Sequence, residues 1–146
     1  MTSLLDVCKL TVELPTAAGW VRPVNEVSLR IDAGESLGLV GESGSGKTML
    51  ALALMGLLPA GARTSGEAWL GAEVKEAEEV KEVKEKGTTR VAPDARKNLV
   101  TLDEREWRAV RGGEIAMVFQ EPMTSLNPVM RIGAQIEEAI RAHESG

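Results

Sequence analysis

The chain has 146 residues, a formal net charge of −5 and an isoelectric point of about 5.0. This length predicts at most one domain, and the acidic balance excludes the broad basic surface that nucleic acid requires. The longest apolar stretch, residues 49–60, is too short to span a bilayer. The first residues include Asp6 and form no basic-then-apolar leader, so we expect no signal peptide. A single cysteine, Cys8, excludes an internal disulfide and suits a reducing cytosol.

The N-terminal part of the chain predicts two strands. Leu5–Val12 and Val24–Ile31 each alternate imperfectly between apolar and polar residues. Asp32–Glu35 has the composition of a turn, which separates the second strand from the next element. Cys8 falls within the first strand, where we expect a small strand residue.

Residues 41–48 read Gly-Glu-Ser-Gly-Ser-Gly-Lys-Thr and fill the pattern G-x-x-x-x-G-K-[ST] of a phosphate-binding loop. Small glycines let the backbone wrap a polyphosphate, so that N–H groups converge on its oxygens. The following helix adds unpaired N–H groups and the positive end of its dipole. We expect Lys47 to reach the β- and γ-phosphates and the Thr48 hydroxyl to hold magnesium. The candidate nucleotide-binding residues here are Gly41, Glu42, Ser43, Gly44, Ser45, Gly46, Lys47, Thr48 and Met49.

The flanks of this loop fit the motif. Ser36–Val40 is short and mostly apolar, which predicts a buried parallel strand. Lys47–Leu58 is rich in Ala, Leu and Met and predicts a helix that Pro59 ends. A chance match in a glycine-rich surface turn would not have both flanks.

A charged run follows a predicted strand at Glu67–Leu70. Opposite charges at i, i+4 are each worth about 0.2–0.5 kcal/mol on an isolated helix, and the run contains three such pairs, Lys75–Glu79, Lys81–Glu85 and Glu82–Lys86. Its apolar residues form only a thin seam: Val74, Ala77, Val80 and Val83. We predict a solvated helical or disordered insertion over residues 72–98, with a docking arm for another subunit as the functional alternative.

Leu99–Glu104 admits two interpretations. It looks like an apolar strand ending in Asp-Glu, the type that binds magnesium in nucleotide-hydrolysing enzymes, although Thr101 interrupts the apolar run. The spacing of Thr101 and Glu104 also fits a capping box that leads into Trp107 and Val110. We predict the helix start, because the capping pattern has a local mechanism.

A second motif lies some seventy residues after the phosphate loop. Ile115–Phe119 predicts a strand, and it runs into Gln120-Glu121-Pro122-Met123-Thr124-Ser125-Leu126-Asn127-Pro128. This strand, glutamine and proline-bounded loop resemble the Q-loop of ABC-type ATPases. The residue sequence of this loop is similar to that of the ATP-binding subunits of dipeptide, oligopeptide and nickel importers. The Gly-Glu-Ser-Gly-Ser-Gly-Lys form of the phosphate loop and Arg111-Gly112 are similar to the same subunits. The resemblance covers nearly the whole chain apart from the charged insertion.

The resemblance implies an α/β fold: an ABC-type P-loop NTPase core with an N-terminal antiparallel β subdomain, truncated before the signature and the second aspartate strand. The segments of this partial nucleotide-binding domain are expected to be the antiparallel part (1–35), the phosphate loop and helix (36–60), the charged insertion (72–98), the Q-loop (114–128) and the start of a helical subdomain (129–146). In the last segment Ile132, Ile136 and Ile140 form one apolar stripe at i, i+4, i+8.

The resemblance also implies functional roles. ATP and Mg²⁺ are the expected cofactors, with Lys47 and Gln120 as catalytic-site residues and Thr48 and Gln120 as magnesium ligands. A carboxamide oxygen is a hard ligand suited to magnesium, although a turn or capping glutamine is the alternative for Gln120 alone. The Gln120–Asn127 loop is expected to contact transmembrane permease subunits, and a second ATP-binding subunit completes the ATP site. The chain would then be cytoplasmic and peripheral on the cytoplasmic face of the membrane.

ABC proteins usually stack adenine on an aromatic residue that precedes the phosphate loop. The chain has no tyrosine, and Trp20 is the aromatic residue near the expected spacing. We name Trp20 as a candidate adenine-binding residue, with a loop tryptophan packed on the small sheet as the alternative.

The resemblance stops near the middle of such a domain, without the signature, second aspartate, glutamate or switch histidine. His143 is in the wrong place for that histidine and is expected to be an exposed helix residue. We therefore expect weak nucleotide binding at best, no meaningful turnover by this chain alone, and an exposed apolar strand edge at Leu37–Val40.

Three functions remain open on the sequence. The first is the ATP-binding subunit of an importer for peptides or nickel. The second is a non-catalytic nucleotide-binding or interaction fragment. The third is a different phosphate-loop enzyme, such as a GTPase or small kinase, which is weakest because no Asn-Lys-x-Asp segment is present.

Overall fold

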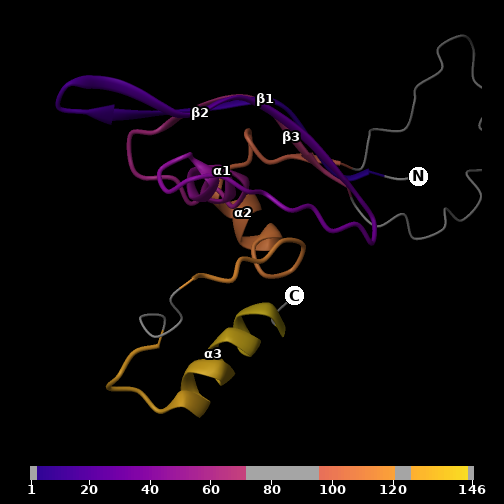
Figure 1. The fold of residues 1–146 in the computed structure, drawn as a ribbon. Coiled ribbons are helices and arrows are strands. Elements are labelled where there is room, and N and C mark those ends of the chain that lie inside the picture. Colours follow the sequence, from indigo (N-terminus) through magenta and orange to yellow (C-terminus); the bar gives the residue numbers. More distant parts are fainter. Residues whose placement is uncertain (1–2, 72–95, 121–125, 145–146) are drawn as a thin grey trace, which may run out of the picture. The chain divides into compact units, whose positions relative to one another are not determined.

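The computed structural model describes residues 3–71, 96–120 and 126–144, which form two units, Met1–Leu102 and Asp103–Gly146 (Figure 1). The first unit holds four strands and one helix: β1 (Ser3–Thr16), β2 (Gly19–Asp32), α1 (Lys47–Leu54), β3 (Arg63–Leu70) and β4 (Lys97–Asn98). The second unit holds two helices, α2 (Glu104–Val110) and α3 (Ile132–Glu144).

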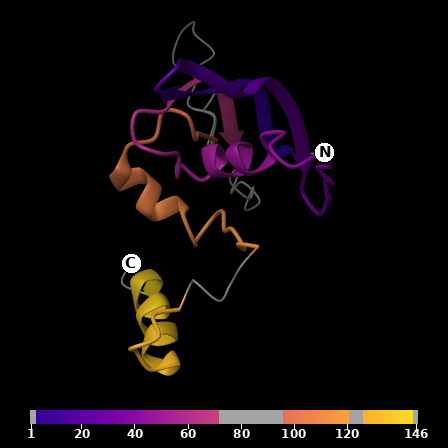
Figure 2. The ribbon, with the colours of Figure 1, turned by 60° about the vertical axis from the view of Figure 1, so that its left-hand side comes forward.

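The strands of the first unit make one antiparallel sheet in the order β2-β1-β3-β4. Both N-terminal strands predicted from the sequence are confirmed, and both extend further than predicted. β1 is the strand between β2 and β3, and its apolar side chains supply much of the core. The helix α1 lies against one face of this sheet (Figures 1 and 2). The buried apolar residues of the unit are Leu5, Val7, Leu10, Val12, Val24, Leu50, Met55, Ala68, Leu70 and Leu99.

The β1–β2 pairing is interrupted by bulges that place non-glycine residues at positive φ. Lys9 has φ 47° and Glu26 has φ 50°. Each has its backbone N–H bonded to a hydroxyl of the other strand: Lys9 N donates to Ser28 Oγ, and Glu26 N donates to Thr11 Oγ1, both at 2.9 Å. Gly66 of β3 passes so close to this region that an added Cβ would lie 2.3 Å from the carbonyl oxygen of Lys9.

The two predicted apolar strands at Ser36–Val40 and Ile115–Phe119 are not strands in this structure, which corrects the sequence prediction. Val40 is 92% exposed and Val118 is 95% exposed. A parallel strand needs a hydrogen-bonded neighbour and cover on both faces. Within the described residues neither segment has a neighbouring strand, apart from a single bridge between Arg111 and Ile115.

The helix after the phosphate loop is confirmed but ends four residues earlier than predicted. Gly56 has φ 61°, its N–H donates to the Ala53 carbonyl, and Leu57 N–H donates to the Leu52 carbonyl. These two bonds form a Schellman motif, in which glycine follows the last helical residues in the left-handed conformation. The stop signal is therefore Gly56 rather than Pro59.

The helix predicted to start near residue 104 is also confirmed, with a different cap. Asp103 accepts a bond from Glu106 N at 2.8 Å, and Glu106 Oε2 accepts one from Asp103 N at 2.8 Å. This reciprocal pair is a capping box. Thr101, the predicted cap, instead donates its hydroxyl proton to the Asn98 carbonyl at 3.0 Å. The magnesium-strand interpretation is wrong, because these residues begin a helix.

The charged insertion lies almost entirely outside the described residues, so its i, i+4 pairs stay predictions. Its last two residues, Lys97 and Asn98, form β4 and pair with Leu70 and Trp69 of β3. The structure therefore joins both ends of the insertion in one antiparallel pair. Within the described ranges no helix is both long enough and apolar enough to cross a membrane.

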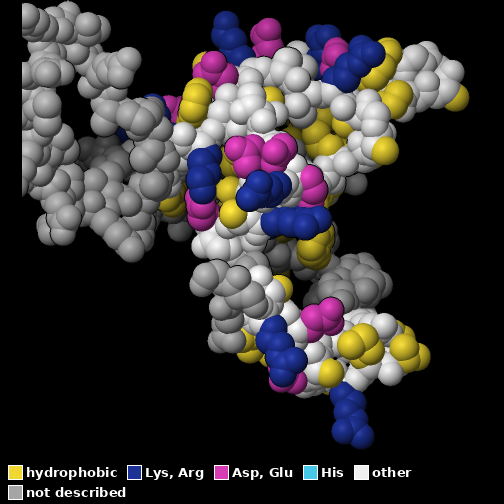
Figure 3. Space-filling model, turned by 180° about the vertical axis from the view of Figure 1, so that it is seen from behind, with side chains coloured by type: hydrophobic (Ala, Val, Ile, Leu, Met, Phe, Trp, Pro, Cys, Tyr) yellow, Lys and Arg dark blue, Asp and Glu magenta, His cyan; other side chains and the backbone are white. Residues whose placement is uncertain are grey.

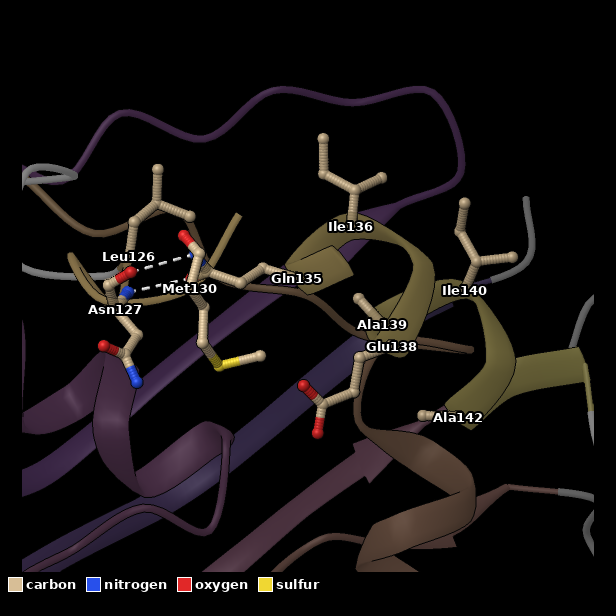
Figure 4. A pocket seen from close by; sticks show the side chains of 9 residues that line it. All are labelled: Leu126, Asn127, Met130, Gln135, Ile136, Glu138, Ala139, Ile140 and Ala142. Carbon is tan, nitrogen blue, oxygen red and sulfur yellow. Dashed lines mark hydrogen bonds between the residues drawn. The ribbon is translucent and has the colours of Figure 1, made fainter. Parts of the chain in front are cut away.

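The predicted C-terminal helix is confirmed as α3, and its isoleucine stripe is exposed. Ile136 and Ile140 project from the same side of α3 and line a pocket of about 650 Å³ with Leu126, Asn127, Met130, Gln135, Glu138, Ala139 and Ala142 (Figure 4). The Gln135 side chain ties the preceding loop to the helix. It accepts a bond from Asn127 N at 2.8 Å, and it donates to the carbonyls of Asn127 at 3.0 Å and Met130 at 3.1 Å.

Candidate nucleotide-binding site

The phosphate loop runs directly into α1, and Gly46 makes that junction. Gly46 has φ 90° and ψ 0°, and its carbonyl accepts the first helical bond from Leu50 N at 2.9 Å. A side chain could not be added here, because a Cβ would lie 2.1 Å from the carbonyl oxygen of Pro23 on β2. The turn of the loop is therefore packed directly on the strand β2.

The ammonium group of Lys47 lies among the loop's own oxygen atoms. Lys47 Nζ donates to the carbonyls of Gly41 and Glu42, both at 2.7 Å, and to Ser45 Oγ at 3.1 Å. An added Cβ on Gly41 would meet Ser45 Oγ at 2.7 Å, so the first glycine of the motif also keeps this space open. The Lys47 ammonium group, which the motif predicts to bind phosphates, therefore lies at the centre of the loop.

The N-terminus of α1 is free for an anion. Its cap, Gly46, provides no side-chain hydrogen bond, and the first turn contains no acidic residue. The unpaired N–H groups of that turn and the positive end of the helix dipole are therefore neither capped nor neutralised by the helix itself. Thr48 in this turn is exposed. Its hydroxyl is therefore accessible to a magnesium ion bound beside a phosphate.

The described residues contain no cluster of three or more His, Cys, Asp or Glu side chains that could hold a metal ion. A magnesium ion that accompanies a nucleotide keeps several waters and takes oxygens from the phosphates, so it needs only one or two protein ligands. The exposed hydroxyl of Thr48 fits such a site.

Trp20 lies in β2 opposite Pro15, which corrects the alternative that placed it in a loop. Its side chain is 48% exposed. The guanidinium carbon of Arg63, the first residue of β3, lies 4.0 Å from the centroid of the Trp20 ring. Trp20 precedes Pro23 by three residues on β2, so the indole and the phosphate loop are both attached to one strand.

These features agree with the comparison against known families. The model of the family described as ABC transporter matches residues 24–145. The chain belongs to the ABC transporter family. This membership establishes an ABC-type P-loop NTPase domain, of which the antiparallel sheet is the N-terminal β part. It also disfavours the GTPase or small-kinase interpretation.

Individual ABC transporter proteins are similar over almost the whole chain. The oligopeptide transport ATP-binding protein OppD of Haemophilus influenzae is 41% identical over 99% of this chain and 37% of its own length. The dipeptide transport ATP-binding protein DppD of Lactococcus lactis is 41% identical over 98% of this chain and 34% of its own length. A putative peptide import ATP-binding protein of Brucella abortus is 40% identical over 96% of this chain and 35% of its own length. The chain spans about a third of the length of the curated relatives it matches.

The second motif of the ABC transporter domain belongs to the second unit. Gln120 is exposed at a bend, and residues 121–125 of its loop lie outside the described residues. The loop is described again from Leu126, where Gln135 holds it against α3. The assignment of Gln120 to magnesium therefore stays a prediction. His143 lies within α3, and its side chain lies outside the described part of the chain.

Three residues near the motifs were not predicted from the sequence: Pro23, Arg63 and Gln135. Arg63 is near Trp20 only because β2 and β3 both pair with β1, and Pro23 is near Gly46 because the phosphate loop packs on β2. A signal did exist for Gln135, since a glutamine one helical turn into a predicted helix can reach back to a preceding loop.

Proposed function

We propose that this chain binds Mg-ATP at the phosphate loop as part of the ATP-binding subunit of an ABC importer. The observation that carries the proposal is the arrangement of the loop: Lys47 Nζ lies at its centre, and the uncapped N-terminus of α1 follows directly. Nothing on the first turn of the helix competes with a phosphate for these donors. A triphosphate would be held by charge-assisted bonds to the lysine and by backbone N–H groups.

The proposed roles follow the motif. Lys47 exchanges its bonds with Gly41 and Glu42 for bonds to the β- and γ-phosphates, and Thr48 provides a magnesium ligand. The backbone of residues 41–49 surrounds the phosphates, Trp20 stacks on the adenine, and Gln120 provides a second magnesium ligand. Thr48 and Gln120 would hold a magnesium ion, whose positive charge would offset the charge of the phosphates.

The proposed cargo is a peptide, with nickel as the other solute that the sequence resemblance allows. Relatives named for oligopeptide and dipeptide transport favour peptide. The proposed partners are transmembrane permease subunits, which would contact the Gln120–Asn127 loop, and a second ATP-binding subunit. These contacts would hold the protein on the cytoplasmic face of the membrane.

The proposal is tested by titrating the purified chain with Mg-ATP in a calorimeter, with Lys47→Ala as the test variant. A hydrogen bond to a charged group is worth about 1.5–3 kcal/mol, so we expect the substitution to weaken binding roughly tenfold or more. Lys97→Ala in β4 is the control, because it removes the same charge outside the loop. Equal affinities of the unaltered chain and Lys47→Ala would refute the proposal.

A further inference from the structure

One side chain of α3, Gln135, joins the end of the Gln120–Asn127 loop to the helix. Its Oε1 accepts a bond from Asn127 N at 2.8 Å, and its Nε2 donates to the carbonyls of Asn127 at 3.0 Å and Met130 at 3.1 Å (Figure 4). A carboxamide has two N–H donors and one acceptor oxygen. Both donors and the acceptor of Gln135 are therefore bonded to the backbone that precedes α3.

The backbone held by Gln135 is a β-turn that begins at Asn127. Met130 N donates to the Asn127 carbonyl at 3.1 Å, and Val129 N donates to Asn127 Oδ1 at 3.1 Å. Asparagine at the first position and proline at the second, here Pro128, are typical of such turns. The turn is closed by its own bonds, and the Gln135 side chain connects it to α3.

Burial does not supply this connection. Among the described side chains from Leu126 to Ala142, Gln135 is half-buried and every other one is exposed. A loop is usually held on a helix by apolar area removed from water, which is small in this segment. Hydrogen bonds of one carboxamide therefore set the position of the turn relative to the helix.

The bonding pattern distinguishes glutamine from glutamate at position 135. The two residues have nearly the same size and similar helix propensity. A carboxylate here could still accept from Asn127 N, but it has no proton to donate. Its oxygens would face the carbonyl oxygens of Asn127 and Met130 and repel them.

We propose that Gln135 is a positioning residue, which holds the C-terminal end of the Gln120–Asn127 loop on α3 so that loop and helix meet a permease subunit as one surface. This inference rests on the proposed function, which assigns the loop to the permease. A surface fixed in advance avoids the entropy cost of ordering the loop on binding. The apolar side chains that form it are exposed and line one pocket: Leu126, Met130, Ile136 and Ile140.

Amide hydrogen exchange followed by NMR tests the connection in the 146-residue chain. Gln135→Met keeps the length and the helix propensity of the side chain and removes all three bonds. We expect exchange at the Asn127 amide to become about three- to tenfold faster, because its acceptor is lost. Exchange at the Ile140 amide should not change, since its helical bond lies inside α3. If Gln135→Met does not fold, Gln135→Ala replaces it in the same comparison.

The matched control is Ala134→Met, which adds the same side chain at an exposed position of α3 that does not line the pocket. It should leave exchange at Asn127 unchanged. A residue that only stabilised the helix would change exchange at Asn127 and Ile140 alike. Unchanged exchange at Asn127 in Gln135→Met, or equal acceleration at both amides, would overturn the inference.

The role in meeting the permease is measured by sedimentation with membrane vesicles that contain the importer's permease subunits. We expect Gln135→Met and Gln135→Glu to weaken binding about two- to tenfold relative to Ala134→Met. Equal binding by all three variants would overturn the positioning role while the proposed partner stands. If the unaltered chain does not bind these vesicles, the proposed partner fails, and the role of Gln135 in meeting it fails too, whatever the exchange rates are.

Discussion

Gly46 shows at the scale of one residue why a motif position is occupied by glycine. The phosphate-loop pattern predicted glycine here for the freedom of its backbone, and φ 90° confirms that need. The structure adds a second reason that the pattern does not contain. The carbonyl of Pro23 occupies the place of any side chain, so Gly46 both turns the loop and attaches it to β2.

We predict that Gly46→Ala destabilises the chain more than Gly34→Ala. Both glycines have positive φ, 90° and 79°, and placing alanine in that conformation costs about 1–2 kcal/mol. Only Gly46 also meets a neighbour, so its substitution should cost roughly 1–3 kcal/mol more. Urea unfolding followed by circular dichroism measures both losses. Equal losses would show that the contact with Pro23 relaxes without cost.

At the scale of elements, the strands that were predicted correctly find their partners nearby. β1 and β2 pair through a two-residue connection, so local alternation was enough to predict them. Ser36–Val40 and Ile115–Phe119 have equally good strand composition but no neighbouring strand among the described residues. Composition describes a preference for extended backbone, whereas a strand also needs hydrogen bonds from another segment, which composition does not contain.

The cap of α2 gives a test at this scale. We predict that Asp103→Ala destabilises α2 by about 0.5–2 kcal/mol, because the aspartate accepts the Glu106 N–H bond. Thr101→Ala should cost less than about 0.5 kcal/mol, because its bond to the Asn98 carbonyl is exposed. Amide hydrogen exchange at Glu106 checks the cap directly. Faster exchange in Thr101→Ala than in Asp103→Ala would show that Thr101 is the N-cap, as the sequence predicted.

For the whole molecule, the most informative observation is how much apolar surface remains uncovered. Charged side chains of both signs are interspersed on the face seen in Figure 3, and apolar side chains gather over α3. Val40, Val118 and Val129 are nearly fully exposed. Within the second unit, the exposed side chains of Leu126, Met130, Ile136 and Ile140 line one pocket, and an apolar patch of this kind is typical of sites that contact other polypeptides. The sequence predicted exposure at Leu37–Val40 but not at Val118, because the latter was expected within a buried strand.

We predict that the isolated chain self-associates through these segments and that Val40→Glu and Val118→Glu together reduce association. Removing one buried valine contact costs about 1.5–3 kcal/mol, so the association constant should fall roughly tenfold or more. Analytical ultracentrifugation over a range of concentrations measures the change. Thr64→Glu, an exposed position on β3, controls for the added charge. A chain that is monomeric at high concentration without substitution would contradict the prediction.

The paired bulges of β1 and β2 also fix the alignment of the sheet. Lys9 and Glu26 satisfy their strained backbones only when Ser28 and Thr11 stand opposite them, so one register is selected. A shift of one residue would move Trp20 about 3.3 Å along the sheet and turn it to the opposite face, away from Arg63. Two hydroxyl groups on β1 and β2 thus determine which residues can meet on the surface of the sheet. Substitutions that leave every motif residue intact can still change which side chains meet across the sheet.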